Sequence, residues 1–349
     1  MRLQNFRSYS DDSFEFEPGV NIIVGPNGSG KTNLLEAILT TVTGSSYRAR
    51  DEDLIHFDKD WARLDVSAAG HQRAIKLIKN NGRVLKNYVF DDKPYKLLTH
   101  QHTMPVVLFE PDHLLLLTGQ PEARRLYLDT LLEQTVLGFA ATRKRYRRAL
   151  TQRNALLKSL KKPHKDQFFV WNLRLSELGG LIARARADLI MDMQKTFPSL
   201  YNEVAKASTK TSINYSSKLP TDGYETKLLK ALEQSHESDI ARGFTSYGPH
   251  RDDFIVSFDG RPASEVASRG EIRTALLAIK IYELGLLEKV RGQKPLFLLD
   301  DVFSELDGKR RHSLASFLQT HQTFITTTDA DLALDERMRD SNIIPITKN

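Results

Sequence analysis

A glycine-rich loop near the N-terminus has the residue types that bind phosphate. Residues 25–32 read Gly-Pro-Asn-Gly-Ser-Gly-Lys-Thr and fit the pattern GxxxxGK[ST]. Glycines let backbone N–H groups crowd against an anion, and Lys31 adds a full positive charge at the outer phosphates. The Thr32 hydroxyl is a candidate ligand for Mg²⁺. The candidate nucleotide-binding residues are this loop and the residue after it: Gly25, Pro26, Asn27, Gly28, Ser29, Gly30, Lys31, Thr32 and Asn33.

The segments on either side of this loop fit the same interpretation. Residues 21–24 read as a short buried strand, and an amphipathic helix begins over 33–38. The alternative is an ordinary glycine turn that caps a helix, but this eight-residue pattern seldom arises by chance between a strand and a helix. We therefore expect nucleotide phosphates, with Mg²⁺, at the start of the helix.

A pair of aspartates far along the chain is expected to form the other half of the nucleotide site. Residues 296–299 form a continuous apolar run, typical of a strand buried on both faces, and Asp300 and Asp301 follow it. Asp300 is a candidate Mg²⁺ ligand, directly or through water, and Asp301 is a candidate to orient or deprotonate the attacking water. The alternative is a pair of turn or helix-capping aspartates. A further apolar strand over 323–328, after a helix over 308–318, is expected beside the first and would bring residues 326–329 to the nucleotide.

Composition excludes several classes of protein. The chain has 349 residues, enough for about two domains, and no cysteine, which removes disulfides, thiolate zinc sites and cysteine nucleophiles. The ten histidines include no HExxH pair. No apolar run reaches membrane-spanning length, and the N-terminal residues lack an apolar leader, so we expect a cytoplasmic protein with no membrane partner.

Positive charge is concentrated in one segment. Residues 142–165 contain ten Lys or Arg and no acid, while the whole chain carries a formal charge of only +6. The apolar residues of this segment recur at alternating steps of four and three, and a second stripe of apolar residues runs over 171–189. This pattern predicts two antiparallel helices that form a short hairpin. The alternative is a solvated helix face, but such a face usually mixes both signs of charge. The candidate DNA-contacting residues are Arg143, Lys144, Arg147, Arg148, Lys158 and Lys161.

A helix start at Ser268-Arg269-Gly270-Glu271 supports two interpretations. Ser268 and Glu271 have the spacing of a capping box, which is the simpler structural interpretation. A capped helix start with a glycine is also an anion site. If two copies face each other, Ser268 and Gly270 of one could close over the γ-phosphate held by Lys31 of the other.

The order of these motifs resembles the ATPase heads of the ABC and SMC class. Finer segments are similar to the RecF family of bacterial recombination mediators: NFRSY at 5–9, FEPGVN before the loop, GKTNLLEAI, residues 106–129, YGPHRDD at 247–253 and LLDDVFSELD. The resemblance implies an ATP-dependent homodimer that binds double-stranded and gapped DNA and acts with RecO and RecR to load RecA at single-strand gaps. It also implies slow, DNA-stimulated ATP hydrolysis as an off-switch, with ATP and Mg²⁺ as cofactors.

The resemblance also implies roles for individual residues. Arg7 is a further nucleotide-binding candidate, Lys31 and Asp301 are the catalytic candidates, and Ser268, Gly270 and Glu271 form the signature segment that acts in trans. Asp301 stands where transporter-type heads usually carry glutamate. Gln101 and Gln120 are candidates for the Q-loop glutamine, and Thr327 or Thr328 for the switch residue.

Taken together, the sequence predicts an α/β fold: an ABC/SMC-like phosphate-loop ATPase head, split in sequence by a mostly helical lobe with a short antiparallel coiled-coil-like hairpin. The predicted head comprises residues 1–120 and 240–349, and the lobe comprises 121–239. Alternating runs at 64–67, 73–79 and 84–90 add an antiparallel layer with a turn at 80–82, and another hairpin is expected around Asp259-Gly260. His250 and Arg251 would contact nucleotide, DNA or the partner lobe. Two rivals remain: the ATPase subunit of a transporter, and an SMC-like scaffold or anti-phage ATPase whose arm binds protein or RNA.

Overall fold

The computed structural model describes residues 1–68, 70–99, 102–159, 165–301, 311, 314, 317–318, 320–328 and 341–347. The chain forms two compact units, which are described separately. Unit 1 contains Met1–Pro111 and Glu283–Asn349, and unit 2 contains Asp112–Tyr282. The combination of parallel and antiparallel sheets with helices agrees with the predicted α/β class.

The central layer of unit 1 is a five-stranded parallel sheet with the strand order β14-β3-β13-β12-β8. Its strands are β3 (Val20–Val24), β8 (Val106–Phe109), β12 (Leu296–Asp300), β13 (Thr323–Thr327) and β14 (Asn342–Pro345). Every residue of β12 and β13 is buried, as expected for strands covered on both faces. The predicted strand over 323–328 is therefore confirmed beside the predicted strand over 296–299.

The parallel register brings the ends of three strands to one edge of this sheet. Asp300 pairs with Thr326, and Thr327 pairs with Val24, so β13 lies between the strand before the glycine-rich loop and the strand before Asp301. Carboxyl ends of parallel strands are the usual position of ligand sites in α/β sheets. Motifs far apart in sequence thereby become neighbours in space.

A second sheet of unit 1 is antiparallel, with the order β2-β1-β4-β5-β6-β7. Its elements are β1 (Arg2–Phe6), β2 (Tyr9–Ser13), β4 (Trp61–Ala68), β5 (His71–Asn80), β6 (Arg83–Phe90) and β7 (Lys93–Tyr95). Asn81 and Gly82 both have positive φ, which suits a two-residue turn between β5 and β6. The predicted antiparallel layer and its turn are confirmed.

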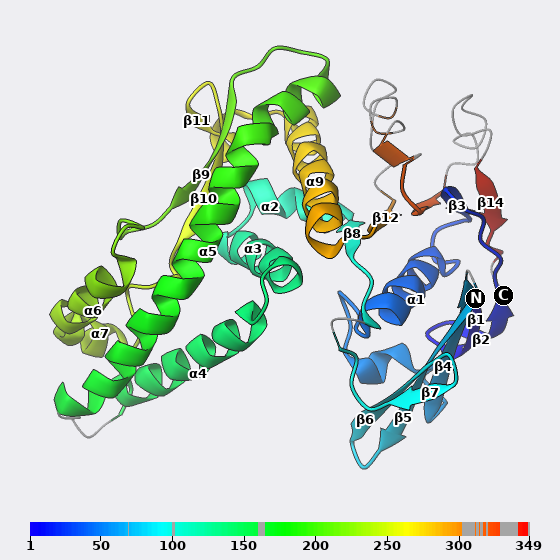
Figure 1. Cartoon of the computed structure of the whole chain (residues 1–349), viewed down its shortest axis with the longest axis horizontal. Coiled ribbons are helices and arrows are strands. Elements are labelled where there is room, and N and C mark those ends of the chain that lie inside the picture. Colours follow the sequence, from blue (N-terminus) through cyan, green and yellow to red (C-terminus); the bar gives the residue numbers. More distant parts are fainter. Residues whose placement is uncertain are drawn as a thin grey trace. The chain divides into compact units, whose positions relative to one another are not determined.

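Helix α1 (Lys31–Thr43) links the two sheets through a shared hydrophobic core. Leu34, Leu35 and Ile38 belong to one buried cluster with Ile23 of the parallel sheet and Leu64 of the antiparallel sheet. Figure 1 shows α1 as a blue helix beside the antiparallel strands of this unit. The short 3₁₀ helix η1 (Asp51–Leu54) follows α1. Because α1 is packed on both sides, its N-terminus is held rigidly at the edge of the parallel sheet.

Unit 2 is mostly helical, with one small sheet. Its helices are η3 (Pro111–Leu114, which begins at the unit boundary), α2 (Leu115–Thr118), α3 (Pro121–Thr135), α4 (Phe139–Leu157), α5 (Lys165–Ala205), α6 (Tyr224–Gln234), α7 (His236–Arg242), α8 (Ala263–Val266) and α9 (Arg269–Arg291, which crosses into unit 1). Its strands β9 (Thr211–Ser216), β10 (Asp253–Phe258) and β11 (Arg261–Pro262) form an antiparallel sheet in the order β11-β10-β9. The turn at Asp259-Gly260, with positive φ at both residues, joins β10 and β11 as predicted.

Helices α4 and α5 form the predicted antiparallel hairpin (Figure 1). At 41 residues, α5 is about twice as long as the predicted second helix. Arg153 of α4 is fully buried within unit 2, where its guanidinium donates to Asp239 (2.8 Å), Asn172 (2.8 Å) and Thr245 (2.8 Å). A buried charge of this kind is tolerated because it is paired and hydrogen-bonded.

The second boundary between the units differs from the predicted domain boundary. The predicted head includes residues 240–282, whereas these residues belong to unit 2. The reason is strand pairing: β10 pairs along its whole length with β9, which belongs to the segment expected to form the lobe. A strand that is bonded to β9 folds with it, so the Ser268 segment also lies in unit 2.

Candidate functional site

The glycine-rich loop has the backbone geometry of a phosphate cradle. Gly28 and Gly30 have φ of 76° and 103°, in the left-handed region that other residues rarely adopt. A Cβ at Gly25 would collide with the carbonyl oxygen of Ile346, and one at Gly30 would approach the Tyr9 hydroxyl at 3.0 Å. Glycine is therefore favoured at Gly28 by its backbone conformation, at Gly25 by steric crowding and at Gly30 by both.

Lys31 lies at the first turn of α1 with its ammonium group folded over the loop. Its Nζ donates to the carbonyl oxygens of Gly25 (2.9 Å) and Pro26 (3.1 Å), and the residue is only 4% exposed. The loop also contains the Ser29 Oγ, which is shielded from solvent and has no hydrogen-bond partner in the described part of the chain. Backbone N–H groups, a helix N-terminus and a lysine thus converge on one concave turn.

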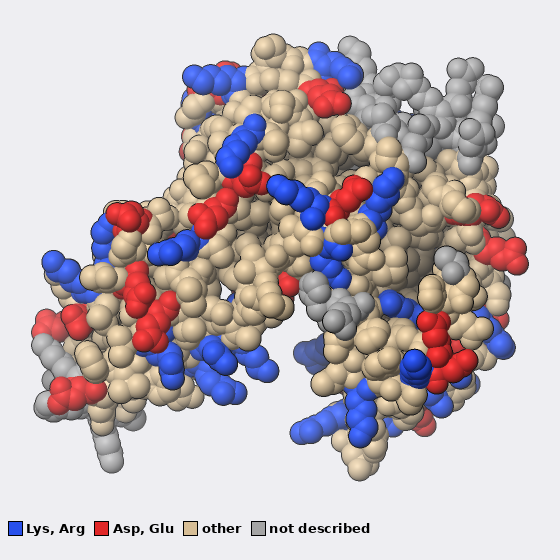
Figure 2. All heavy atoms as spheres, in the orientation of Figure 1, with Lys and Arg blue, Asp and Glu red and all other residues tan. Residues whose placement is uncertain are grey.

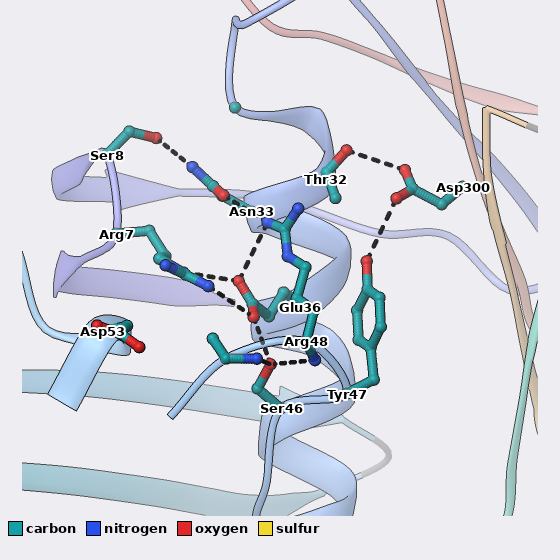
Figure 3. Close-up of polar contacts among 12 residues, drawn as sticks. Arg7, Ser8, Thr32, Asn33, Glu36, Ser46, Tyr47, Arg48, Asp53 and Asp300 are labelled. Atoms are coloured by element: carbon teal, nitrogen blue, oxygen red, sulfur yellow. Dashed lines mark hydrogen bonds and ion pairs between the residues drawn. The ribbon is translucent and has the colours of Figure 1, made fainter. Parts of the chain in front are cut away.

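Asp300 lies beside Thr32, although the two residues are 268 positions apart in sequence. The Thr32 hydroxyl donates to Asp300 Oδ1 at 3.0 Å, and the Thr326 hydroxyl donates to the same oxygen at 2.7 Å. The Tyr47 hydroxyl approaches the other oxygen, Oδ2, at 3.3 Å (Figure 3). The structure therefore brings together the two residues that the sequence analysis proposed as Mg²⁺ ligands.

Asp301 follows directly and has an unusual backbone conformation. Its φ is 52°, and its N–H donates to the Thr326 hydroxyl at 2.9 Å. Aspartate adopts this left-handed region more readily than most other residues, which suits it to the turn that follows the strand. The turn places Asp301 immediately after the buried strand β12, at the same sheet edge as Asp300.

An ion cluster surrounds Glu36, one turn beyond the loop on α1. Arg7 binds its carboxylate with two hydrogen bonds of 2.8 and 3.0 Å, and Arg48 approaches it at 3.2 Å (Figure 3). Ser46 Oγ donates a further short hydrogen bond to Glu36 Oε1. Burial alone would raise the pKa of Glu36, but these donors together lower it. Glu36 thus remains an anion that holds two arginines near the start of α1.

A hollow of about 610 Å³ opens beside this cluster. Its walls include Arg7, Ser8, Asn33, Arg48, Glu52, Asp53, Ile55, Phe57 and Lys79, all from unit 1. The Arg48 side chain also donates to Asn33 Oδ1 at 2.8 Å. Because Asn33 directly follows the loop, the hollow is next to the phosphate cradle and has room for a nucleoside.

These residues fit a nucleoside triphosphate with Mg²⁺. The loop supplies anion-binding N–H groups, and Thr32 and Asp300 supply oxygen ligands at one place. No group of three or more His, Cys, Asp or Glu within the described residues forms a ready-made cation site. This agrees with magnesium chemistry, in which one or two protein oxygens act together with phosphates and waters.

The start of α9 is a capping box, as predicted. Ser268 N–H and Oγ both donate to Glu271 Oε2 at 2.7 Å, and Glu271 N–H donates back to Ser268 Oγ at 3.3 Å. Gly270 lies in the first turn of the same helix. The proposed role of Ser268, Gly270 and Glu271 at a nucleotide of a second copy remains a prediction.

The cations of α4 divide into two groups. Arg143 pairs with Asp129 at 3.0 Å and Glu133 at 2.6 Å, and Arg153 is buried with Asp239, so these two are compensated within unit 2. The exposed group has no ion pair with any described residue and comprises Lys144, Arg145, Arg147 and Arg148 of the helix, with Lys158 directly after it. Figure 2 shows Lys and Arg gathered along the edge that α4 forms. Lys161, the remaining candidate, lies outside the described residues.

The YGPHRDD segment packs within unit 2. His250 Nδ1 lies 2.7 Å from the Tyr146 hydroxyl and Nε2 lies 3.0 Å from the Thr245 carbonyl, and burial lowers the pKa of His250 to about 4. Arg251 lies over the Phe244 ring. Both residues therefore contact other residues of unit 2, and the expected contact with nucleotide or DNA remains a prediction.

The structure describes some of the candidates for the Q-loop glutamine and the switch residue. Gln120 precedes α3 as its N-cap, and Gln101 lies outside the described residues. Thr327 is buried, and its carbonyl accepts from Gly25 N–H at 3.3 Å, whereas Thr328 is exposed. The SELD turn at 304–307 and Asp329 also lie outside the described residues, as does most of the expected helix over 308–318.

Comparison with known families identifies the class. The model described as RecF/RecN/SMC N terminal domain matches residues 1–343, and the chain belongs to this family. An SMC head domain from Pyrococcus furiosus, bound to the C-terminal domain of ScpA, shares the fold with a TM-score of 0.52 at 16% identity, covering 100% of this chain and 92% of that chain. The predicted ABC/SMC-like ATPase fold is confirmed.

Matches to individual proteins define the relationship of this chain more specifically than the family model does. The DNA replication and repair protein RecF of Listeria monocytogenes serotype 4b is 31% identical over 359 residues, covering 99% of this chain and 96% of that protein. RecF of Heliobacterium modesticaldum is 34% identical over 339 residues, covering 94% and 91%. A solved structure of the recombination mediator protein RecF-ATP in the RecFOR pathway has a TM-score of 0.82 and 30% identity, covering 95% and 91%. The resemblance to the RecF family is confirmed.

Sequence reasoning missed Glu36, Ser46, Tyr47 and Arg48. Glu36 lies in the GKTNLLEAI segment, where its position one turn after Lys31 was the available signal. The other three lie in a loop without a motif, and only the fold brings them to α1 and Asp300.

No helix in the described part of the chain is long and apolar enough to cross a membrane.

Proposed function

We propose that this protein is an ATP-dependent DNA-binding protein of recombinational repair and replication restart. In this proposal ATP and Mg²⁺ bind at the edge of the parallel sheet in unit 1. Loading of RecA at single-strand gaps, together with RecO and RecR, is proposed from the kinship with RecF proteins. The observation that carries the proposal is the meeting of the phosphate loop with Asp300 through the Thr32 hydroxyl.

Each residue has a role in this site. Lys31 and the loop N–H groups bind the phosphates, the hollow beside Arg7 and Arg48 takes the nucleoside, and Thr32 with Asp300 holds Mg²⁺, which neutralises charge on the phosphates. Asp301 orients or deprotonates the attacking water. Its carboxylate is one carbon shorter than glutamate, which suits slow hydrolysis that serves as an off-switch.

The signature segment belongs to the proposed dimer. Ser268 and Gly270 of a second copy close over the outer phosphate, so ATP binding favours association of two chains. The exposed cations of α4 then contact the phosphate backbone of duplex or gapped DNA, because a cluster of uncompensated cations attracts a polyanion. DNA-stimulated hydrolysis separates the copies.

The nucleotide assignment is tested with Lys31→Ala. Removing the ammonium group deletes the one full positive charge in the cradle, so ATP affinity measured by calorimetry should fall at least tenfold. The matched control is Lys93→Ala, which removes an exposed lysine of β7 in the same unit and should bind ATP as the wild type does. Wild-type affinity in Lys31→Ala would show that the loop is not the phosphate site.

A further inference from the structure

The carboxylate of Asp300 has a different environment at each oxygen. Oδ1 accepts from Thr32 at 3.0 Å and from Thr326 at 2.7 Å, while Oδ2 faces the Tyr47 hydroxyl at 3.3 Å (Figure 3). A carboxylate fixed by donors on both oxygens cannot rotate freely about its χ2 bond. Among the described residues, Tyr47 therefore supplies the hydroxyl that restrains Oδ2, the oxygen of Asp300 that does not accept from Thr32.

The residues on either side of Tyr47 fix it in place. Ser46 donates to Glu36 of α1, and Arg48 donates to Glu36 at 3.2 Å and to Asn33 at 2.8 Å. The Ser46 hydroxyl also accepts from Arg48 N–H at 3.1 Å, which closes the turn. The backbone around Tyr47 is thus tied to the same helix that begins with the phosphate loop, and the Tyr47 ring extends from it to β12.

The hydroxyl of Tyr47 acts as a donor at physiological pH. An ordinary phenol has a pKa of about 10 and therefore carries its hydrogen at neutral pH. The phenol therefore stays protonated, and its hydrogen is available to the carboxylate oxygen. A phenolate would instead repel Asp300.

We propose that Tyr47 is a positioning residue of the magnesium site that acts through Asp300. The inference rests on the proposed ATP and Mg²⁺ binding at Thr32 and Asp300. By holding Oδ2, Tyr47 keeps Oδ1 turned toward Thr32, so the two oxygen ligands are already aligned before metal binds. Outer groups that orient ligating carboxylates typically change metal affinity 10- to 100-fold when removed.

The test is Tyr47→Phe, which keeps the ring and removes only the hydroxyl. Binding of the fluorescent analogue mant-ATP is measured first in EDTA and then during titration with MgCl₂. Because the hydrogen bond is long, we expect the lower end of the range, with the Mg²⁺ midpoint rising about tenfold. Binding in EDTA should be unchanged, since the phosphate loop and hollow are untouched.

A matched control and three outcomes make the test decisive. Tyr88→Phe removes another buried phenol hydroxyl of unit 1 and should keep the wild-type Mg²⁺ midpoint. An unchanged midpoint in Tyr47→Phe would overturn the inference. An equal loss of binding with and without Mg²⁺ would also overturn it, because that pattern indicates a packing role. If wild type binds no mant-ATP at all, the proposed function itself fails, and the inference with it.

Discussion

At the scale of single residues, Glu36 is the centre of the polar network next to the phosphate loop. It is fully buried, yet it accepts from Arg7, Arg48 and Ser46, and the resulting ion pairs fix the two arginines on one wall of the hollow. A buried carboxylate needs such partners because its desolvation is costly. The network therefore ties the shape of the hollow to the first turns of α1.

Replacing Glu36 with glutamine tests this role. The variant keeps the side-chain shape but removes the charge, which leaves two guanidinium groups without their anion. We expect a loss of about 1–3 kcal/mol in the free energy of unfolding at neutral pH, measured by urea denaturation. The control Asp11→Asn breaks the exposed Arg2–Asp11 pair and should cause a much smaller change.

The lowered pKa of Glu36 predicts that its contribution to the free energy of unfolding depends on pH. Because the pKa of Glu36 is lowered in the folded protein, its stabilisation is fully present above its unfolded-state pKa of about 4.3 and is lost as the pH falls through the lower folded value. The stability difference between wild type and Glu36→Gln should therefore shrink in acid. A difference that is absent at neutral pH would contradict the assignment.

Residue motifs predicted only part of this site. The loop, Thr32 and Asp300 were predictable because their chemistry requires fixed residue types at fixed spacing or directly after a buried strand. Tyr47 and Arg48 were not, because their partners lie in other elements and no local pattern records such contacts. The capping box at Ser268 was predictable because both partners are three residues apart.

At the scale of elements, the basic face of α4 is the feature on which the proposed DNA binding depends. The sequence predicted a basic helix in a hairpin, but it counted all ten cations as uncompensated. The fold shows that Asp129 and Glu133 neutralise Arg143, and that Asp239 neutralises Arg153. Local sequence contains no acid in this segment, so compensation by distant acids could be seen only in the structure.

Charge reversal at two exposed arginines tests the DNA-binding face. Arg147→Glu with Arg148→Glu should weaken binding to duplex DNA and reduce the salt dependence, with the log–log slope falling by about 0.9 for each DNA phosphate that the variant no longer binds. ATP binding should stay at the wild-type level, because the proposed nucleotide-binding residues lie in unit 1.

The control for that experiment makes the same change of charge elsewhere. Lys206→Glu with Lys230→Glu reverses two exposed lysines of unit 2 that lie outside α4. If both double variants lose DNA affinity equally, net charge alone explains the effect. If neither does, α4 is not the DNA-binding face.

At the scale of the whole molecule, the proposed nucleotide site and the proposed signature segment belong to different units. The loop and Asp300 lie in unit 1, whereas Ser268 lies in unit 2. The sequence predicted the split head and its order, but it assigned residues 240–282 to the head because it could not predict the pairing of β10 with β9. Long-range strand pairing depends on tertiary packing, which a local pattern does not specify.

The most direct test of the central claim measures molecular mass and DNA affinity together, with ATP and Mg²⁺, with ADP, and without nucleotide, for wild type and Ser268→Arg. The bulky cation at the start of α9 should block closure over the nucleotide of a second copy. The proposal predicts a dimer and tight DNA binding only with ATP, and the loss of both in Ser268→Arg. The proposal would be contradicted if the DNA affinity were the same with ATP, with ADP and without nucleotide, and if the protein stayed monomeric throughout.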